Sequence, residues 1–234
     1  MVFIMQIAII CGGLATRLKK VSKTVPKSMI EINGKPFLQY QIEMLKKQKI
    51  KDIVLCVGHL SEKIESYFGN GSKFGVNIKY SYDKDKLLGP IGAVKNAESL
   101  LEDEFFIMYG DSYIFVDFKK VYEFYKKQQK LACMVVYKNE NKYDKSNLAV
   151  EKNMVVAHKD DSKGHDIDYI DYGTSILNKK SLDFIPKNEF FSTEKFFKIL
   201  ILKNELLAYV VKKRFYHIGT PEALEEYRNY IKNQ

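Results

Sequence analysis

Residues 7–27 combine glycines and cationic side chains in a pattern that can bind phosphate. The segment reads I-A-I-I-C-G-G-L-A-T-R-L-K-K-V-S-K-T-V-P-K. Its apolar start predicts a buried strand, and Gly12-Gly13 ends that strand in a turn whose backbone N–H groups can approach an anion. Arg17 and Lys27 follow and can neutralise the anion's charge. Neither G-x-G-x-x-G nor G-x-x-x-x-G-K-[ST] is present, so the ordinary dinucleotide and P-loop motifs are excluded.

Asp111 is the second residue whose position suggests chemistry. It follows a predicted buried strand at 105–109, in the sequence Gly110-Asp111-Ser112. A carboxylate at such a strand end can hold Mg²⁺, and the metal can bridge phosphate oxygens while one phosphoryl bond forms and another breaks. We therefore predict Arg17, Lys27 and Asp111 as catalytic residues and Mg²⁺ as the cofactor.

The first half of the chain alternates strands with helices. We predict strands at 5–10, 52–58, 77–82 and 105–109, a short extended piece at 29–32, and helices at 36–48, 61–68 and 117–129. A second glycine loop at 88–97, with Gly89 and Gly92, is expected to lead into a helix that runs to Leu101. This alternation predicts a Rossmann-like, doubly wound α/β fold with helices on both faces of a mixed, mainly parallel sheet. Such sheets bind ligands at the carboxyl ends of their strands, where both glycine loops and Asp111 fall.

The second half is richer in β-structure. We predict extended runs at 132–137, 148–151, 154–157 and 172–177, a helix at 193–202, a strand at 206–211 and a terminal helix that starts at Pro221. The polar segment 159–171 is predicted to be a mobile loop over the site. Because no repeat, low-complexity tract or linker interrupts the chain, residues 1–234 are predicted to form a single domain.

The composition is that of a soluble globular protein. The chain has 234 residues, of which 46% are hydrophobic and 29% are charged. No apolar run approaches the roughly 20 residues of a membrane span, and the first five residues lack the features of a signal peptide. Cys11, Cys56 and Cys133 have no paired spacing, so we predict core thiols of a cytoplasmic protein, with neither zinc nor a disulfide.

The formal net charge of +9 raises the possibility of a nucleic-acid partner. The lysines, however, are spread along predicted helix faces, with no arginine cluster and no interleaved aromatic residues. We therefore predict neither a nucleic-acid nor a membrane partner. A basic chain also attracts anionic small molecules, which agrees with a phosphate site.

Several motifs together resemble one enzyme family. They are G-G-L-A-T-R-L, P-K-S-M, L-G-P-I-G-A-V-K-N-A, Y-G-D-S, H-K-D at His158–Asp160 and I-G-T-P-E at Ile218–Glu222. In this order they resemble the motifs of the sugar-phosphate nucleotidylyltransferase family (NDP-sugar pyrophosphorylase-like), in its short bacterial form. The resemblance covers nearly the whole chain.

The resemblance implies a reaction and a set of roles. Members of the family transfer a nucleoside monophosphate from a nucleoside triphosphate to a phosphorylated small-molecule acceptor and release pyrophosphate. The part at about 5–130 would bind the nucleotide and the part at about 131–234 the acceptor, and a homodimer is possible. The implied nucleotide-binding residues are Cys11, Gly12, Gly13, Ala15, Thr16, Gly89 and Gly92. The implied acceptor-binding residues are Lys159, Asp171, Gly173 and Glu194.

Three positions depart from the family pattern. Ala15 replaces a glycine of the first loop. Asp171 falls where the family has an asparagine that binds the sugar, and a carboxylate can only accept hydrogen bonds. His217 stands where the family has a second metal-binding aspartate, although Mg²⁺ prefers oxygen ligands. We therefore expect Asp111 to hold the metal, with His217 as a weaker candidate ligand or as a packing residue.

These departures bear on the substrates that we expect. Asp171 would suit a cationic acceptor, which favours CTP as the donor and the cytidylyltransferase branch of the family. The acceptor would be a sugar 1-phosphate or a non-sugar phosphate that carries an amine. The product would be an activated precursor for a bacterial surface polysaccharide or capsule. A catalytically inert, nucleotide-binding regulatory module is the alternative that His217 leaves open.

Overall fold

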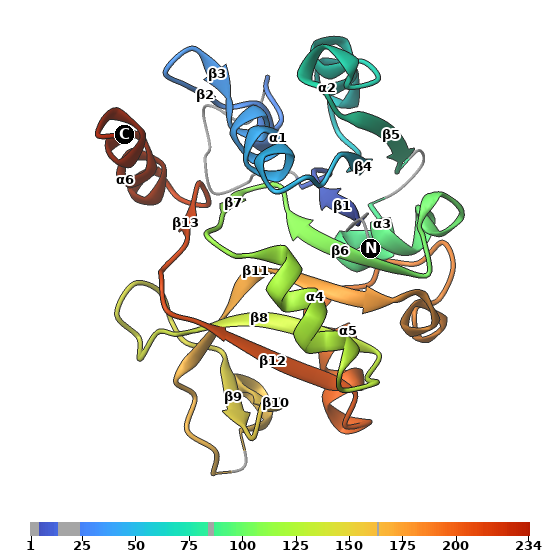
Figure 1. Cartoon of the computed structure of the whole chain (residues 1–234), viewed down its shortest axis with the longest axis vertical. Coiled ribbons are helices and arrows are strands. Elements are labelled where there is room, and N and C mark those ends of the chain that lie inside the picture. Colours follow the sequence, from blue (N-terminus) through green and yellow to red (C-terminus); the bar gives the residue numbers. More distant parts are fainter. Residues whose placement is uncertain (1–4, 14–23, 84–86, 163) are drawn as a thin grey trace.

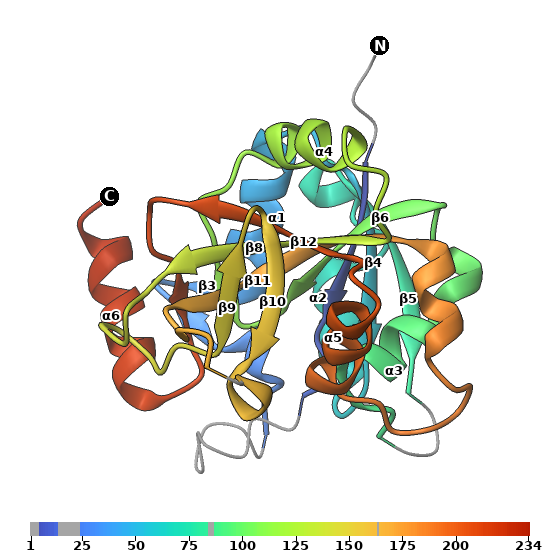
Figure 2. The same cartoon turned by 90° about the horizontal axis from the view of Figure 1, so that it is seen from below.

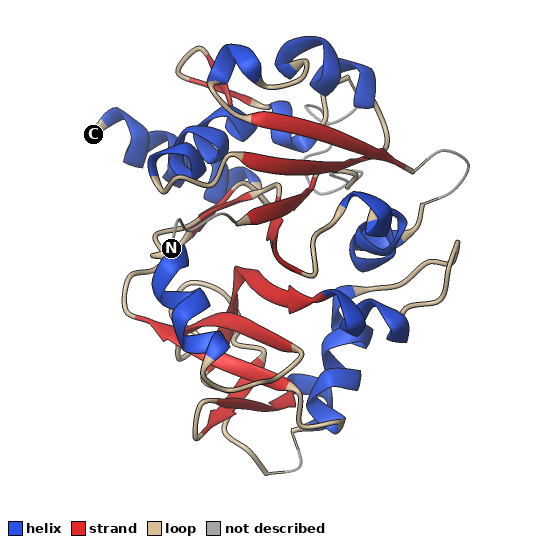
Figure 3. Ribbon diagram, turned by 45° about the vertical axis from the view of Figure 1, so that its right-hand side comes forward, coloured by secondary structure: helices blue, strands red, loops and turns tan. Residues whose placement is uncertain are grey.

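A mixed β-sheet runs through the middle of the molecule, with helices on the outside (Figures 1 and 3). The computed structural model describes residues 5–13, 24–83, 87–162 and 164–234. The predicted site residues Ala15, Thr16 and Arg17 lie outside these ranges. The described residues form one α/β domain, as predicted.

The helices and strands follow the predicted order closely. The α-helices are α1 (Phe37–Lys47), α2 (Ser61–Phe68), α3 (Gly89–Asn96), α4 (Phe118–Lys126), α5 (Thr193–Leu202) and α6 (Pro221–Lys232). The strands of the large sheet are β1 (Gln6–Ile10), β4 (Asp52–Val57), β5 (Asn77–Tyr82), β6 (Glu104–Tyr109), β8 (Ala132–Lys138), β9 (Leu148–Glu151), β10 (Met154–His158), β11 (Tyr169–Asn178) and β12 (Leu206–Val211). Two short pairs, β2 (Glu31–Ile32) with β3 (Lys35–Pro36) and β7 (Ser112–Tyr113) with β13 (Tyr216–His217), stand apart from it.

The large sheet joins a parallel half to a largely antiparallel half. Its nine strands lie in the order β5-β4-β1-β6-β11-β8-β12-β10-β9. Neighbours from β5 to β6 are parallel, as are β8 and β12, whereas β11 runs antiparallel to both β6 and β8. The prediction of a mainly parallel sheet therefore fits the N-terminal half only. The β-rich part continues the same sheet because β11 inserts beside β6.

Both faces of the sheet are covered, as predicted. Ile7 and Ile9 of β1 face one buried cluster, which α1, α2 and α4 complete, whereas Ala8 faces another, which α3 and α5 complete. Figure 2 shows α4 and α5 on opposite sides of the sheet. Burial of alternate residues on opposite faces explains why residues 7–10 of this strand are a continuous apolar run.

The bounds of α3 and β11 differ most from the predicted ones. The predicted glycine loop at 88–97 is already helical, because α3 begins at Gly89 with Pro90 in its first turn, and α3 ends at Asn96 instead of Leu101. Strand β11 begins at Tyr169, so Asp171 lies on a strand and not in the predicted loop. The start of this strand could not be recognised in the sequence because the residues there are mostly polar. In the structure, residues 169–171 pair with residues 136–138 of β8, and an irregularity after Asp171 shifts the register.

The pair β7 and β13 brings the C-terminal motif to Asp111. His217 is paired with Ser112, and the Ile218 N–H donates to the Asp111 carbonyl oxygen at 2.9 Å. A strand of two residues is too short to show the alternation of apolar and polar residues by which strands are recognised, so this contact was not predicted. It places the end of the chain beside the strand end that carries Asp111.

The three cysteines are free and buried, which confirms the prediction of core thiols. Within the described ranges, the structure contains no helix whose length and apolar character would let it span a membrane.

Candidate active site

The first cavity lies at the carboxyl ends of the parallel strands. It has a volume of about 580 Å³. Among its lining residues are the predicted Cys11, Gly12, Gly13, Lys27, Gly89 and Asp111. Both glycine segments and the predicted catalytic pair therefore border one space, which we call the nucleotide cavity.

Cys11 contributes backbone to this cavity and not a reactive thiolate. Its side chain is buried, and its N–H donates to the Cys56 carbonyl oxygen at 2.8 Å, so it continues the pairing of β1 with β4. Burial raises the pKa of the Cys11 thiol to about 12, although a hydrogen bond with Ser28 opposes this shift. A thiol with so high a pKa is neutral at physiological pH and a poor nucleophile.

The second cavity borders the antiparallel half of the sheet and has a volume of about 400 Å³. Its lining includes the predicted acceptor residues Lys159, Asp171, Gly173 and Glu194, together with His217. We call it the acceptor cavity. The predicted acceptor residues come from the end of β10, from β11 and from the first turn of α5, which the Ser192 side chain caps by accepting from the Lys195 N–H.

The two cavities meet at four residues. Lys27, Tyr109, Asp111 and Thr193 line both of them. At this junction the Lys27 ammonium lies 2.5 Å from the Asp111 carboxylate, and both side chains are partly exposed. The predicted catalytic lysine and the predicted metal ligand therefore stand where a donor in one cavity would meet an acceptor in the other.

Gly110 explains how Asp111 reaches the junction. The Gly110 N–H donates to the Ile10 carbonyl oxygen at 3.0 Å, which extends the pairing of β6 with β1. A Cβ on Gly110 would lie 2.7 Å from that same oxygen. Because only glycine allows this approach, the Gly-Asp sequence presents the carboxylate directly beside the Gly12-Gly13 turn.

Asp111 suits Mg²⁺ as a single protein ligand. Its Oδ2 contacts Lys27, and its Oδ1 accepts a hydrogen bond from the Ser112 hydroxyl at 3.3 Å. Magnesium in nucleotide enzymes is often held by one or two carboxylates together with substrate phosphates and water. The donor set at the junction fits this pattern without a second carboxylate.

His217 is engaged by the protein through both ring nitrogens. Its Nδ1 accepts from the Gly219 N–H at 2.9 Å, so the ring proton is assigned to Nε2, which donates to the Asp144 carboxylate at 3.0 Å. This arrangement leaves neither nitrogen for a metal ion. It gives His217 a positioning role in the turn that ends at Gly219, which also lines the acceptor cavity.

Asp171 forms part of the wall of the acceptor cavity beside the junction. Its carboxylate accepts from the Tyr109 hydroxyl at 2.9 Å and from the Gly173 N–H at 2.8 Å. Burial raises the pKa of Asp171 from 3.8 to about 6, and these two hydrogen bonds limit the rise. Asp171 therefore presents a mainly ionised acceptor group to the cavity at neutral pH and a donor below about pH 6.

We expect Asp171→Asn to change how stability depends on pH. Because the folded-state pKa lies above 3.8, the folded chain binds this proton more tightly, and the free energy of unfolding falls as pH rises from about 4 to 6. An asparagine removes this titration while its oxygen still accepts from Tyr109. Urea unfolding at several pH values should therefore show a flatter profile between pH 4 and 6 for the variant. The exposed Asp166→Asn is the control, and profiles of Asp171→Asn and wild type that run parallel would contradict the assignment.

Gly173 is required by its backbone conformation and by its neighbour. Its φ is +88°, and a Cβ would lie 2.9 Å from the Ser112 side chain. We expect Gly173→Ala to lower the free energy of unfolding by about 1–3 kcal/mol, the usual cost of such a strained position. Gly34→Ala is the matched control, since Gly34 has a φ of +78° and no atom within 4 Å of the added Cβ. Equal losses in urea unfolding would show that the Ser112 contact is unimportant.

Gly92 does not line either cavity. Instead it packs under the segment 189–191, where a Cβ would lie 2.9 Å from the Glu189 carbonyl oxygen.

Four residues that line the nucleotide cavity were not predicted. They are Tyr109, Thr193, Asp83 and Phe190. The positions of Asp83 and Tyr109 at the ends of strands were the available signal for these two, whereas Phe190 has none.

A charged cluster lies at the rim of the acceptor cavity. His158, Asp160 and Glu194 are close enough to share a metal ion. The Lys198 ammonium, however, lies 3.4 Å from Asp160 and 3.1 Å from Glu194, so it already balances the negative charge. Burial lowers the pKa of His158, which keeps the ring neutral at physiological pH. We read this cluster as part of the wall that holds Lys159 and Glu194.

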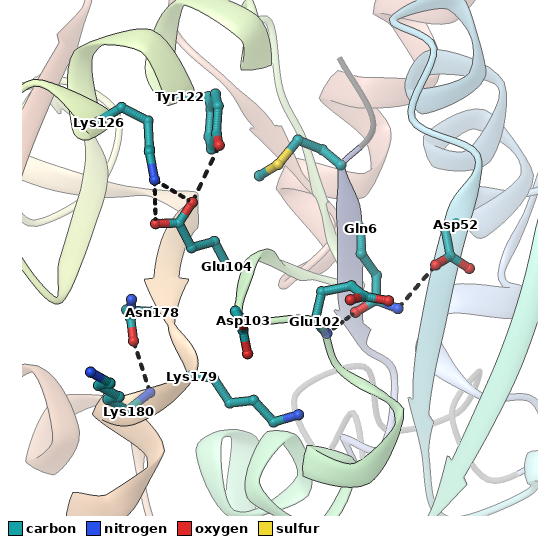
Figure 4. Close-up of a pocket in the computed structure, with 11 residues that line it drawn as sticks. Gln6, Asp52, Glu102, Asp103, Glu104, Tyr122, Lys126, Asn178, Lys179 and Lys180 are labelled. Carbon is teal, nitrogen blue, oxygen red and sulfur yellow. Dashed lines mark hydrogen bonds and ion pairs between the residues drawn. The ribbon is translucent and has the colours of Figure 1, made fainter. Parts of the chain in front are cut away.

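A further cavity of about 680 Å³ lies at the opposite edge of the sheet (Figure 4). It is lined by the first residues of β1, β4 and β6 and by Asn178 at the end of β11. Its charges are partly paired, because Lys126 binds Glu104 at 2.9 Å and Gln6 binds Asp52 at 3.1 Å. None of the predicted site residues that the structure describes lies there, so the candidate active site is the pair of cavities at the carboxyl edge.

The chain is similar to known proteins over nearly its whole length. A model of the protein family described as nucleotidyl transferase matches residues 7–234. The D-glycero-alpha-D-manno-heptose 1-phosphate guanylyltransferase of Campylobacter jejuni is 33% identical over 230 residues, which are 98% of this chain and 100% of the relative. The enzyme of the same name from Aneurinibacillus thermoaerophilus is 32% identical over 235 residues, 97% of this chain and 100% of the relative.

A solved structure supports the same relationship. The structure of HddC from Yersinia pseudotuberculosis complexed with GMP-PN superposes with a TM-score of 0.79 and 27% identity. The match covers 97% of this chain and 100% of that one. The similarity therefore extends over both cavities and is not confined to the nucleotide-binding half.

Proposed function

The chain belongs to the nucleotidyl transferase family, and on that premise we propose that it transfers GMP from GTP to a sugar 1-phosphate and releases pyrophosphate. The observation that carries this proposal is the junction of the two cavities at Lys27 and Asp111. A nucleotide in one cavity and a phosphate monoester in the other would bring the α-phosphorus and the attacking oxygen together there.

GTP is the donor that the relatives favour. Both full-length relatives are named as guanylyltransferases, and the solved HddC contains GMP-PN. The predicted preference for CTP finds no support among them. We accordingly propose a guanine nucleotide as the donor and set the cytidylyltransferase branch aside.

We propose a heptose 1-phosphate, or another pyranose 1-phosphate, as the acceptor. The two relatives are named for a manno-heptose 1-phosphate. In the acceptor cavity, Lys159 offers a cation for the phosphate, and Asp171 and Glu194 offer carboxylates that can accept from sugar hydroxyls. The product would be a nucleotide-activated sugar, as predicted for a precursor of surface polysaccharide.

The chemistry requires positioning and charge neutralisation. An oxygen of the acceptor phosphate attacks the α-phosphorus of GTP, the bond from that phosphorus to the oxygen bridging to the β-phosphate breaks, and pyrophosphate leaves with the electron pair. The attacking oxygen is already ionised, so no protein base or nucleophile is needed. The Lys27 ammonium is placed to stabilise the charge that gathers around the α-phosphate.

We propose that Asp111 holds Mg²⁺ together with the phosphates of GTP. When bound, the ion would neutralise phosphate charge and act as a Lewis acid. Because nucleoside triphosphates are cytoplasmic metabolites, the reaction would take place in the cytoplasm. The homodimer stays a prediction.

A substrate panel tests the proposal. The purified chain, with Mg²⁺, would be assayed for pyrophosphate with GTP, CTP, UTP and dTTP against a set of hexose and heptose 1-phosphates. We expect pyrophosphate release that depends on both GTP and an acceptor. Release with CTP alone among the nucleotides would overturn the donor assignment. Nucleotide binding without pyrophosphate from any acceptor would instead favour the inert regulatory module.

A further inference from the structure

Helix α1, which the structure describes in full, buries one polar side chain. Gln41 is 0% exposed. A buried amide costs free energy unless hydrogen bonds compensate for the water that it loses. The other buried residues of this helix are all apolar, namely Phe37, Leu38, Ile42, Met44 and Leu45. A glutamine at this position therefore requires an explanation beyond the packing of the core.

The Gln41 amide nitrogen donates two hydrogen bonds to the segment that carries Asp111. Its Nε2 lies 2.9 Å from the Tyr109 carbonyl oxygen and 2.7 Å from the Ser112 carbonyl oxygen. Both hydrogens of the amide group are thereby used. Because these carbonyl groups flank Gly110-Asp111, Gln41 bridges the two ends of the turn that presents the carboxylate.

The Gln41 amide oxygen shows that this bridge has a cost. Its Oε1 is buried and has no hydrogen-bond partner among the described residues. A buried acceptor without a partner lowers the stability of the fold. An apolar side chain of similar length, such as methionine, would avoid this cost. The two donated hydrogen bonds are therefore what a glutamine contributes here.

Backbone contacts hold the middle of the same turn. The Gly110 N–H donates to the Ile10 carbonyl oxygen, and the Asp111 carbonyl oxygen accepts from the Ile218 N–H. These two contacts fix the turn against β1 and against the C-terminal motif. Gln41 adds a third attachment, to α1, so the direction in which the Asp111 side chain leaves the backbone is set from three sides.

Helix α1 is also attached to the segment that carries Lys27. The Phe37 N–H donates to the Ile30 carbonyl oxygen at 3.0 Å, and the Ile30 N–H donates to the Lys27 carbonyl oxygen at 3.2 Å. Through Gln41, the same helix holds the turn of Asp111. Both partners of the contact between Lys27 and Asp111 at the junction are thus connected to α1.

We propose that Gln41 is a positioning residue that fixes the Asp111 carboxylate relative to Lys27 and to the phosphates of the donor nucleotide. This assignment rests on the proposed function, in which Asp111 holds Mg²⁺. Gln41 lines neither cavity, so it acts through the backbone at 109–112. Hydrogen-bond partners that orient a metal ligand commonly matter for metal affinity and for activity.

The test measures how much Mg²⁺ strengthens the binding of GTP. Dissociation constants for GTP would be measured by calorimetry on the full chain, with and without Mg²⁺ and without an acceptor sugar. Gln41→Met removes the two donors and should reduce the gain from Mg²⁺ roughly 10-fold. The affinity for GTP without Mg²⁺ should not change, whereas a merely structural role would weaken binding in both conditions. An unchanged gain from Mg²⁺ would overturn the proposal.

Gln6→Met is the matched control. Gln6 is also buried, at 2% exposure, and its Nε2 also donates twice, to the Asp52 carboxylate at 3.1 Å and to the Leu100 carbonyl oxygen at 3.0 Å (Figure 4). It lies at the opposite edge of the sheet, so Gln6→Met should leave the gain from Mg²⁺ unchanged. An equal reduction in both variants would mean that loss of any buried glutamine has this effect, and would overturn the specific role of Gln41.

A double variant tests whether Gln41 acts through Asp111. Gln41→Met should lower kcat roughly 10- to 100-fold in the wild-type background and have little further effect in Asp111→Asn. Losses that multiply in the double variant would overturn the proposal. If the gain from Mg²⁺ depended on Gln41 as expected but no acceptor gave pyrophosphate, the proposed function alone would be refuted.

One measurement needs no variant, and so it does not depend on the folding of Gln41→Met. In nuclear magnetic resonance spectra of the isotope-labelled wild type, the side-chain amide signals of Gln41 should shift when Mg²⁺ is added to the complex with GTP. Those of Gln6 should stay in place, because Gln6 lies at the opposite edge. Gln41 signals that do not move would show that Asp111 and Gln41 are not coupled, and would overturn the proposal.

Discussion

Asp111→Asn is expected to lower kcat by at least about 100-fold while the fold stays intact. Asp111 is the one predicted site residue whose carboxylate faces both cavities beside Lys27. A bound divalent ion contributes several kcal/mol to the stabilisation of charge in the transition state, and an amide binds such an ion far more weakly. Initial rates of pyrophosphate release at saturating GTP, acceptor and Mg²⁺ measure the loss.

Asp117→Asn provides the control for this change. Asp117 caps α4 by accepting from the Lys120 N–H, and asparagine is an equally good cap, so activity and stability should both stay near wild type. If Asp111→Asn kept the wild-type rate at every Mg²⁺ concentration, Asp111 could not be the metal ligand. A partial rate that higher Mg²⁺ restores would agree with weakened binding of the ion.

Lys27→Met is expected to lower kcat by about 10²–10³, with a smaller change in the KM for GTP. The Lys27 ammonium is fixed at the start of a short 3-10 helix (Lys27–Met29) and lies 2.5 Å from the Asp111 carboxylate. Loss of one preorganised charge-stabilising group typically costs about 3–4 kcal/mol in the transition state. Methionine keeps most of the side-chain volume, so the change isolates the charge. Steady-state kinetics with both substrates varied separate kcat from KM.

Lys35→Met is the control for the loss of a cation. Lys35 pairs with Glu43 on an exposed surface and lies in neither cavity, so its removal should not affect kcat. A matching drop in both variants would mean that net charge, and not the position of Lys27, matters. Because Lys27 and Asp111 are in contact, the double variant should lose less than the sum of the single losses.

Local patterns in the sequence were sufficient to predict most of the helices and strands. The apolar run at 7–10 indicates a strand buried on both faces, and β1 is the strand between β4 and β6. Helix α5 has its predicted bounds because Ser192 caps it before an amphipathic run. Local signals of this kind depend on backbone hydrogen bonding and on burial within one element, so they can be read without knowing the fold.

The features that were not predicted depend on contacts between segments that are far apart in the sequence. The start of β11 at Tyr169 follows from its pairing with β8, and the polar residues around Asp171 conceal it. The hydrogen bond of His217 to Asp144 joins residues that are 73 positions apart, so the motif alone suggested a metal ligand where the structure has a positioning residue. Phe190 carries no signal, since only its place beside Gly89 distinguishes it from any other phenylalanine.

Isotope transfer tests most directly whether the α-phosphate of GTP moves to the acceptor across the junction. The purified chain, GTP labelled at either the α- or the γ-phosphate, Mg²⁺ and a heptose 1-phosphate would be incubated and the products separated. We predict that the α-label appears in a nucleotide-linked sugar and the γ-label in pyrophosphate, and that both products form at least about 100-fold more slowly in Asp111→Asn. Transfer of the γ-label to the sugar, or no transfer of either label to any sugar 1-phosphate, would contradict nucleotidyl transfer across this junction.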